Sequence, residues 1–146
     1  MEKVFDINLD IKRSTQALIG AVQYDNNTSI LSITLTDENK PFEISDGYDV
    51  ELVFRRPDRK IFIISGEISI KGNSKILRFT LDASMLSVFG IADVEIRISK
   101  EEDVLTTGRF ALEIRESLLS SGEEKVYLAK VNPIPIDKIE SVFMGV

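Results

Sequence analysis

Residues 21–57 read AVQYDNNTSILSITLTDENKPFEISDGYDVELVFRRP, and apolar side chains fill alternate positions in two runs of this stretch. A two-residue period is typical of a β-strand that buries one face. The inward positions of the two runs are Leu31, Ile33, Leu35, Tyr48, Val50, Leu52 and Phe54. Between the runs, residues 37–41 read Asp-Glu-Asn-Lys-Pro, which favours a turn. The stretch therefore predicts a half-buried β-hairpin or the edge of a β-sandwich.

The same alternation continues on both sides of this stretch and predicts further strands. They cover 3–13, 17–23, 61–64, 66–70, 77–81, 94–98 and 110–114, and 17–23 reads as a short central strand because both of its faces are apolar. Residues 82–90 break the period, and we expect a helical turn that Asp82 caps and that packs Leu86 and Phe89 on the core. About eight strands without intervening helices favour an all-β, antiparallel β-sandwich of immunoglobulin-like layout.

Residues 117–146 depart from this pattern, so we expect a β-sandwich domain over 1–116 and an extension over 117–146. Residues 126–131 predict one more short strand, and Asp137 resembles the cap of a helix that begins there. The apolar side chains of the extension either fold back over the sandwich or contact another chain. The candidate contact residues are Val126, Tyr127, Leu128, Val131, Ile139, Val142 and Phe143. We expect weak self-association through 126–146.

Composition excludes several classes of function. The 146 residues include no cysteine and no histidine, which rules out Ser-His-Asp triads, Cys-His pairs and histidine-based metal sites. Carboxylates lie mostly in turns or on outward positions, so we expect no enzyme, no metal and no cofactor, unless a cleft brings two acids together. The net charge of −6 is spread along the chain, which argues against nucleic-acid binding.

The chain also lacks the sequence features of an exported or membrane protein. Its first residues do not follow the basic-then-apolar layout of a signal peptide. No apolar run approaches the ~18 residues that a transmembrane helix requires. We therefore expect a protein that is made in the cytoplasm and has no membrane partner.

The densest cluster of positive charge lies at residues 55–60. Its cationic members are Arg55, Arg56, Arg59 and Lys60. One interpretation is a binding site for an anion, such as a phosphate, teichoic acid or an acidic partner surface. The alternative is a solvated turn whose charges keep a sheet edge from pairing with another chain. A sugar-binding face has little support because the chain has no tryptophan.

Five short segments, taken in order, resemble a known family. They read YDNNTSIL at 24–31, LTD at 35–37, KP at 40–41, VFRRPD at 53–58 and VLTTGRF at 104–110. Across roughly 17–116 the chain resembles the N-terminal domain of baseplate upper proteins from tailed phages and prophages of Gram-positive bacteria. Arg59 stands where that family usually has glycine, so the type of this turn is left open.

The resemblance implies a structural virion protein that is made in the host cytoplasm and assembled into the tail baseplate. Members of the family look like immunoglobulin-type domains that attach to the tail hub, followed by helical linkers that trimerise and carry receptor-binding proteins. The implied partners are other baseplate and tail subunits and further copies of the chain, as a trimer in the full-length context. The alternative function is a module that binds carbohydrate or teichoic acid on the host surface.

Overall fold

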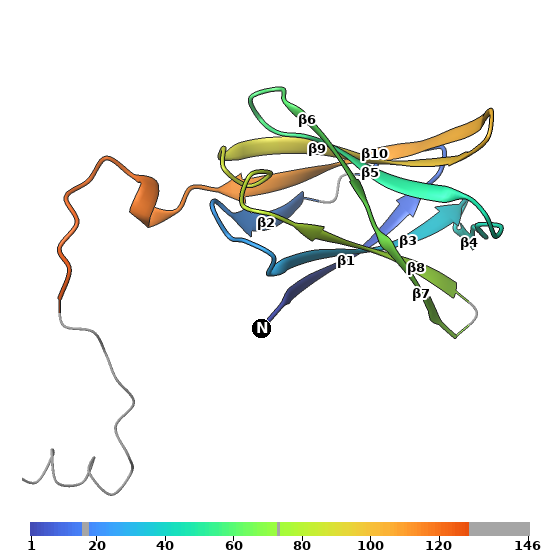
Figure 1. Ribbon diagram of the computed structural model, residues 1–146, viewed down its shortest axis with the longest axis horizontal. Helices are drawn as coiled ribbons and strands as arrows, with labels where there is room; N and C mark the ends of the chain where they lie inside the picture. The colour runs from blue at the N-terminus through green and yellow to red at the C-terminus, as the bar shows by residue number, and fades with distance from the viewer. Residues whose placement is uncertain (16–17, 73, 129–146) are drawn as a thin grey trace, which may run out of the picture.

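The structure, a computed structural model, describes residues 1–15, 18–72 and 74–128, and its strands form two stacked sheets (Figure 1). Sheet A has the order β1-β3-β8-β7, with β4 beside β3, and sheet B has the order β2-β10-β9-β5-β6. The strands of sheet A are β1 (Lys3–Asp10), β3 (Ser29–Asp37), β4 (Lys40–Pro41), β7 (Glu67–Lys71) and β8 (Ser74–Leu81). Those of sheet B are β2 (Leu18–Val22), β5 (Asp49–Arg55), β6 (Ile61–Ser65), β9 (Gly90–Lys100) and β10 (Asp103–Arg115). The predicted all-β sandwich is confirmed.

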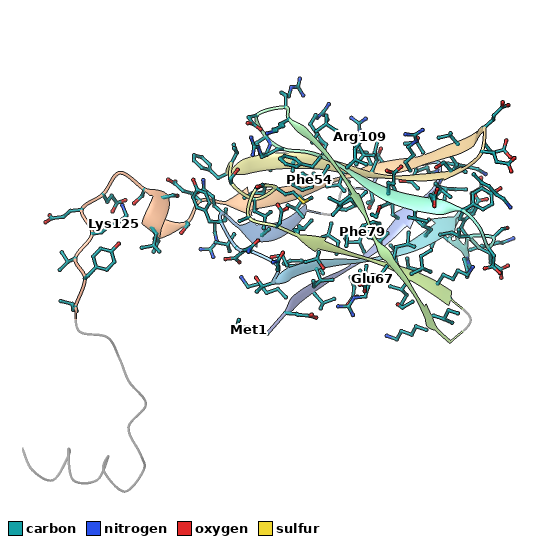
Figure 2. All side chains as sticks on the ribbon, in the orientation of Figure 1. Met1, Phe54, Glu67, Phe79, Arg109 and Lys125 are labelled. Carbon is teal, nitrogen blue, oxygen red and sulfur yellow. The ribbon has the colours of Figure 1, made fainter. Side chains whose placement is uncertain are left out.

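The core lies between the sheets and uses the inward positions that the alternation predicts. Phe54 of sheet B and Phe79 of sheet A are fully buried and lie between the layers (Figure 2). The predicted inward residues Leu31, Ile33 and Leu35 are also buried. Tyr48 is half-buried and packs at the margin of the core. Each large apolar side chain of this kind contributes about 1.5–3 kcal/mol when fully buried.

The predicted hairpin between the two apolar runs is wrong. These runs form β3 and β5, which lie in different sheets on either side of the core. The turn at 37–41 is present, with positive φ angles at Glu38 and Asn39 of 51° and 67°. It leads only into the two-residue strand β4, which pairs with the end of β3. The apolar run from residue 48 then joins the opposite sheet.

The sheets are mixed rather than fully antiparallel. β1 pairs with β3 in parallel, and β2 pairs with β10 in parallel. Strands joined by a tight hairpin must be antiparallel, whereas strands joined by a crossover can run in parallel. The chain leaves sheet A after β1, adds β2 to sheet B, and returns to sheet A as β3, so the hairpin rule does not apply. β2 is accordingly an edge strand and not the central strand that its apolar sequence predicts.

The chain changes sheets a second time at Gly66. β6 closes the free side of sheet B and β7 closes the same side of sheet A, and Figure 1 shows them as one long ribbon that crosses between the layers. An added Cβ at Gly66 would lie 2.4 Å from Cε1 of Phe79. The crossing therefore depends on a residue without a side chain.

Residues 82–90 form the predicted turn, which the side chain of Asp82 stabilises by accepting a hydrogen bond from the amide of Met85 at 2.9 Å. Leu86 is fully buried, as expected. Phe89 is 53% exposed, so its predicted place on the core is wrong. The turn is short, and Phe89 is its last residue before β9 begins at Gly90.

The apolar side chains in the described part of the extension do not pack on the sandwich. After β10, a 3₁₀ turn (η1, Leu118–Ser120) is followed by residues without regular structure, and Val126, Tyr127 and Leu128 are 74%, 85% and 87% exposed. The strand predicted from residue 126 is therefore not formed at 126–128. The remainder of that strand, the predicted helix and the contact residues Val131, Ile139, Val142 and Phe143 lie outside the described residues. The helices of the described part are too short to cross a membrane.

Candidate functional site

Arg56 is a structural residue rather than a free cation. Its guanidinium donates two hydrogen bonds of 2.7 Å to the carboxylate of Asp58, one of 2.9 Å to the carbonyl of Ser84 and one of 2.8 Å to the hydroxyl of Ser87. It also lies 5.3 Å from the ring centroid of Phe62. The hydrogen bonds between Arg56 and Asp58 raise the pKa of Arg56 and lower the pKa of Asp58. Arg56 thus ties the β5–β6 turn to the turn at 82–90.

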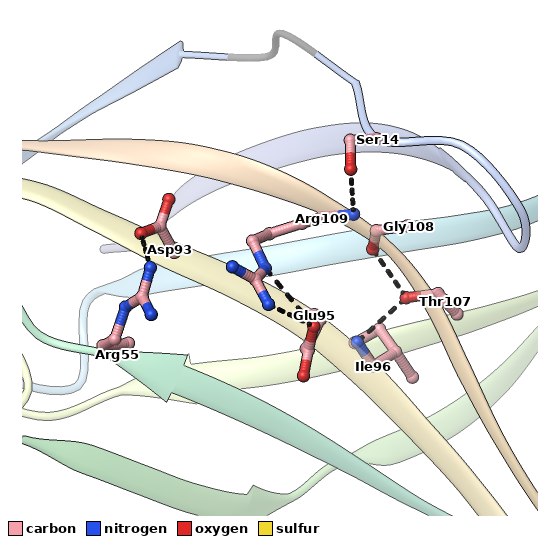
Figure 3. Close-up of polar contacts among 8 residues, drawn as sticks. All are labelled: Ser14, Arg55, Asp93, Glu95, Ile96, Thr107, Gly108 and Arg109. Carbon is pink, nitrogen blue, oxygen red and sulfur yellow. Dashed lines mark hydrogen bonds and ion pairs between the residues drawn. The ribbon is translucent and has the colours of Figure 1, made fainter.

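Arg55 belongs to a row of ion pairs on the outer face of sheet B (Figure 3). It bonds Asp93 on the neighbouring strand β9. Two residues further along β9, Glu95 accepts a hydrogen bond of 3.3 Å from Arg109 on β10. Opposite charges in adjacent strands stabilise a sheet surface modestly. The charge of Arg55 is therefore already compensated within the domain.

Arg59 and Lys60 form the exposed part of the predicted cationic cluster. Arg59 adopts a φ of 78° in a turn where its amide donates to the carbonyl of Arg56 at 2.8 Å, while the amide of Arg56 donates to the carbonyl of Lys60 at 2.9 Å. This is a type I turn followed by a left-handed residue, a common hairpin connection. The structure brings all four predicted cations to one end of the sandwich, but it leaves only these two without an acidic partner among the described residues.

Gln23, which sequence reasoning missed, fixes the point where the extension leaves the sandwich. Its side chain is 7% exposed. Its amide donates a 2.8 Å hydrogen bond to the carbonyl of Ser87, and its carbonyl oxygen accepts one of 2.6 Å from the hydroxyl of Ser120 and one of 3.3 Å from the amide of Ser117. The only signal in the sequence is a polar residue that directly continues the apolar run of β2.

Replacing Gln23 with leucine is expected to lower the free energy of unfolding by about 1–3 kcal/mol, because three polar groups lose their partner in a partly buried site. The substitution should destabilise the base of the extension locally, in addition to lowering the stability of the whole domain. Hydrogen exchange at the amides of 117–120 should accelerate more than exchange in β9. Unchanged exchange at 117–120 would show that Gln23 does not hold the base of the extension.

Asp10 anchors the loop that carries the chain from β1 to β2. Its carboxylate accepts hydrogen bonds from the amides of Lys12 at 2.7 Å, Arg13 at 3.1 Å and Glu38 at 2.9 Å. These bonds, that from Lys12 foremost, lower the pKa of Asp10. The ion pair with Asp37 at 3.0 Å raises the pKa of Lys12. The loop is therefore held at its start by charge-assisted bonds.

Further along, the loop rests on a β-bulge of β10 (Figure 3). The hydroxyl of Thr107 accepts a 3.0 Å hydrogen bond from the amide of Ile96, in place of a carbonyl of the ladder. The amide of Arg109 donates to the hydroxyl of Ser14 at 3.1 Å. Gly108 lies directly beneath the loop, so the bulge forms the surface over which the chain crosses.

Two hollows in the described part of the surface lack the enclosure of a catalytic cleft. They have volumes of about 270 and 290 Å³ and flank the segment at residues 42–44 at one end of the sandwich. The second contains Glu43 and Asp103, both exposed, whereas a catalytic acid pair needs an apolar enclosure. Across 1–15, 18–72 and 74–128, no three acidic side chains gather as metal ligands would.

One edge of sheet A is formed by β7. All five of its residues are exposed, and Ile68 and Ile70 are 46% and 75% exposed. Glu67, labelled in Figure 2, begins the strand and Lys71 ends it. Neither forms an ion pair with another described residue. An edge of this kind presents unpaired backbone groups to solvent.

Comparisons with known proteins bear on the function of this fold. The family model of the BppU N-terminal domain matches residues 3–142. Among solved structures, the chain is similar to the N-terminal domain of phage TP901-1 ORF48, with a TM-score of 0.62 and 11% identity, over 76% of this chain and 97% of that chain. At this identity the structural likeness supports the fold alone. No curated protein matches the chain.

Proposed function

The chain belongs to the family of BppU N-terminal domains, the N-terminal domains of phage baseplate upper proteins, and we propose from this that it docks to the hub of the tail and supports receptor-binding proteins there. Its role in the phage baseplate is structural. The family match over 3–142 is the observation that carries the proposal. In this role the domain is assembled into the virion tail and acts during attachment to the host.

Docking to a neighbouring subunit requires a contact surface, and we assign this surface to the extension. Val126, Tyr127 and Leu128 are highly exposed, and exposed apolar side chains in a group usually mark an interaction site. They follow a base that Gln23 holds against the sandwich. A fixed base followed by exposed apolar residues suits a segment that reaches a neighbouring subunit, and 117–146 is thus proposed as the interaction unit and 1–116 as its support.

A second contact is proposed at the β5–β6 turn, where Arg59 and Lys60 are exposed. They extend from a rigid hairpin turn and have no acidic partner in the described part of the chain. Such charges guide the approach of an acidic surface and set its orientation more than they add affinity. We therefore assign them to orientation of the domain on its neighbour, and Arg55 and Arg56 to the stability of the turn.

Tyr127→Ser combined with Leu128→Ser is expected to weaken binding to the purified hub protein of the same phage by at least about tenfold. The fold should be unaffected because both side chains are exposed. Size-exclusion chromatography with light scattering measures the complex, and thermal unfolding checks the fold. The matched control is Ile91→Ser with Val104→Ser, which are also exposed but lie on the sandwich, and it should bind like the wild type. Equal binding by wild type and by the tail variant would contradict the role of 126–128.

Binding of teichoic acid or another anionic host polymer is the alternative function. The arrangement weakens it, because the guanidinium groups of Arg55 and Arg56 are already engaged by carboxylates. To reach Arg55 or Arg56, an anionic ligand would have to displace Asp93 or Asp58, which leaves only Arg59 and Lys60 of this cluster free to bind it. Specific binding to a glycan array that is lost in the Arg59→Ala, Lys60→Ala variant would favour the alternative over docking.

A further inference from the structure

We propose that two copies of this chain pair through their β7 strands, which extends sheet A across a two-fold axis. This inference concerns a second copy of the chain and does not depend on docking to the tail hub. It rests on the unpaired edge of β7, on the exposure of its two isoleucines and on the position of its two charges.

The backbone of β7 is oriented for such pairing. Lys71 pairs with Ser74 at the closed end of the β7–β8 hairpin, and the residues that close a tight hairpin are hydrogen bonded to each other. Bonding alternates along an antiparallel ladder, so Ser69 and Glu67 also point their amides and carbonyls toward β8. Ile68 and Ile70 therefore direct theirs outward. Pairing Ile68 with Ile70 of a second, antiparallel copy satisfies these groups on both chains.

The side chains of β7 are complementary to themselves in this register. The strand reads Glu-Ile-Ser-Ile-Lys, so an antiparallel copy places Glu67 opposite Lys71 at both ends of the seam. The four isoleucines then lie together on the inner face. Opposite charges and apolar pairs at facing positions each stabilise strand pairing. A partner of unrelated sequence would have no reason to match this order, which is why a second copy is the occupant.

The surface around β7 has two hollows that a second copy of the chain would cover. Ile70 lines a hollow of about 270 Å³ with Leu35 and Ile44, and Ile68 lines a second hollow of about 470 Å³ beside β5. The core is thus incompletely covered along this side. Protected edges usually carry a charge, a proline or a bulge in mid-strand, and β7 carries isoleucines there. A second copy would cover both hollows.

Sedimentation velocity of the full chain over a range of concentrations tests the pairing. The weight-average mass of the wild type should rise from 16.4 kDa toward twice that value. Ile70→Lys should raise the dissociation constant by about tenfold or more, because it buries an unpaired charge in the seam. Ile63→Lys is the matched control: it makes the same change at a 57% exposed position of β6. It should associate like the wild type. Tyr127→Ser with Leu128→Ser should do so too, which distinguishes the β7 seam from the self-association through 126–146 that the sequence predicts.

Charge exchange tests the register. Glu67→Lys and Lys71→Glu alone should each weaken association, because each places like charges together at both ends. An equimolar mixture of the two single variants should associate again, since every facing pair is then opposite in sign. A wild type that stays at 16.4 kDa at every concentration would overturn the proposal. The proposal would also be overturned if Ile63→Lys weakened association as much as Ile70→Lys, or if only Tyr127→Ser with Leu128→Ser weakened it. A mixture of Glu67→Lys and Lys71→Glu that associates no better than either variant alone would overturn it as well.

Discussion

Replacing Gly108 with alanine is expected to lower the free energy of unfolding by about 3 kcal/mol or more. An added Cβ would lie 1.8 Å from the carbonyl oxygen of Arg13, 2.3 Å from its carbonyl carbon and 2.8 Å from the amide nitrogen of Ser14. All three are backbone atoms, so no rotation of a flexible side chain relieves the overlap. The loop between β1 and β2 would have to move off the bulge.

Moving that loop breaks the hydrogen bonds that hold it on β10 just before β2 begins. The loop is held at the bulge by the hydrogen bond from Arg109 to Ser14 and by one of 2.9 Å from the amide of Thr15 to the carbonyl of Arg109. At its other end Asp10 binds the amides of Lys12 and Arg13. A midpoint of thermal unfolding lower by about 10 °C is the expected readout in circular dichroism.

Gly20→Ala is the matched control for this prediction. Gly20 lies in β2, and no atom comes within 4 Å of the position of its added Cβ. The same substitution should therefore change stability by less than about 0.5 kcal/mol or raise it slightly, because alanine restricts the unfolded chain. If Gly108→Ala unfolds at the same denaturant concentration as the control, the close approach of the loop is wrong.

Gly66→Ala is the second large expected effect, with a loss of about 2–4 kcal/mol. The added Cβ would lie 2.4 and 2.6 Å from two ring atoms of Phe79 and 2.8 Å from the carbonyl oxygen of Arg78. Phe79 is 1% exposed and packs in the core, so its ring cannot swing into solvent. The chain would have to shift exactly where it passes from β6 to β7.

A double-mutant cycle with Phe79→Leu tests whether overlap with the Phe79 ring causes the loss of stability. Leucine removes the ring atoms that meet the added Cβ but leaves a cavity, so Phe79→Leu alone should cost about 1–2 kcal/mol. In the Gly66→Ala background the same change should cost much less or restore stability, with a coupling energy of about 1 kcal/mol or more. Strict additivity of the two losses, measured by denaturant unfolding, would contradict the contact between Gly66 and Phe79.

The interaction surfaces were predictable to different degrees. The cluster at 55–60 was visible as charge, but its division into paired Arg55 and Arg56 and exposed Arg59 and Lys60 depends on Asp93, Asp58 and the turn at 82–90. The exposure of Val126, Tyr127 and Leu128 agrees with a segment outside the sandwich pattern. Gln23 could not be anticipated because its partners Ser87, Ser117 and Ser120 lie far away in the chain. The β7 edge could not be anticipated because it depends on the order of the strands in sheet A.

The alternation of apolar residues determined by itself which side of each strand is buried, because a period of two places alternate side chains on opposite faces whatever the strand pairs with. It therefore predicted Leu31, Leu52 and Phe54 as core residues. Only the tertiary structure decided which sheet each strand joins, which pairs are parallel and which strands are edges. Those choices depend on the two crossings, over Gly108 and at Gly66, where backbone and core approach so closely that no side chain fits.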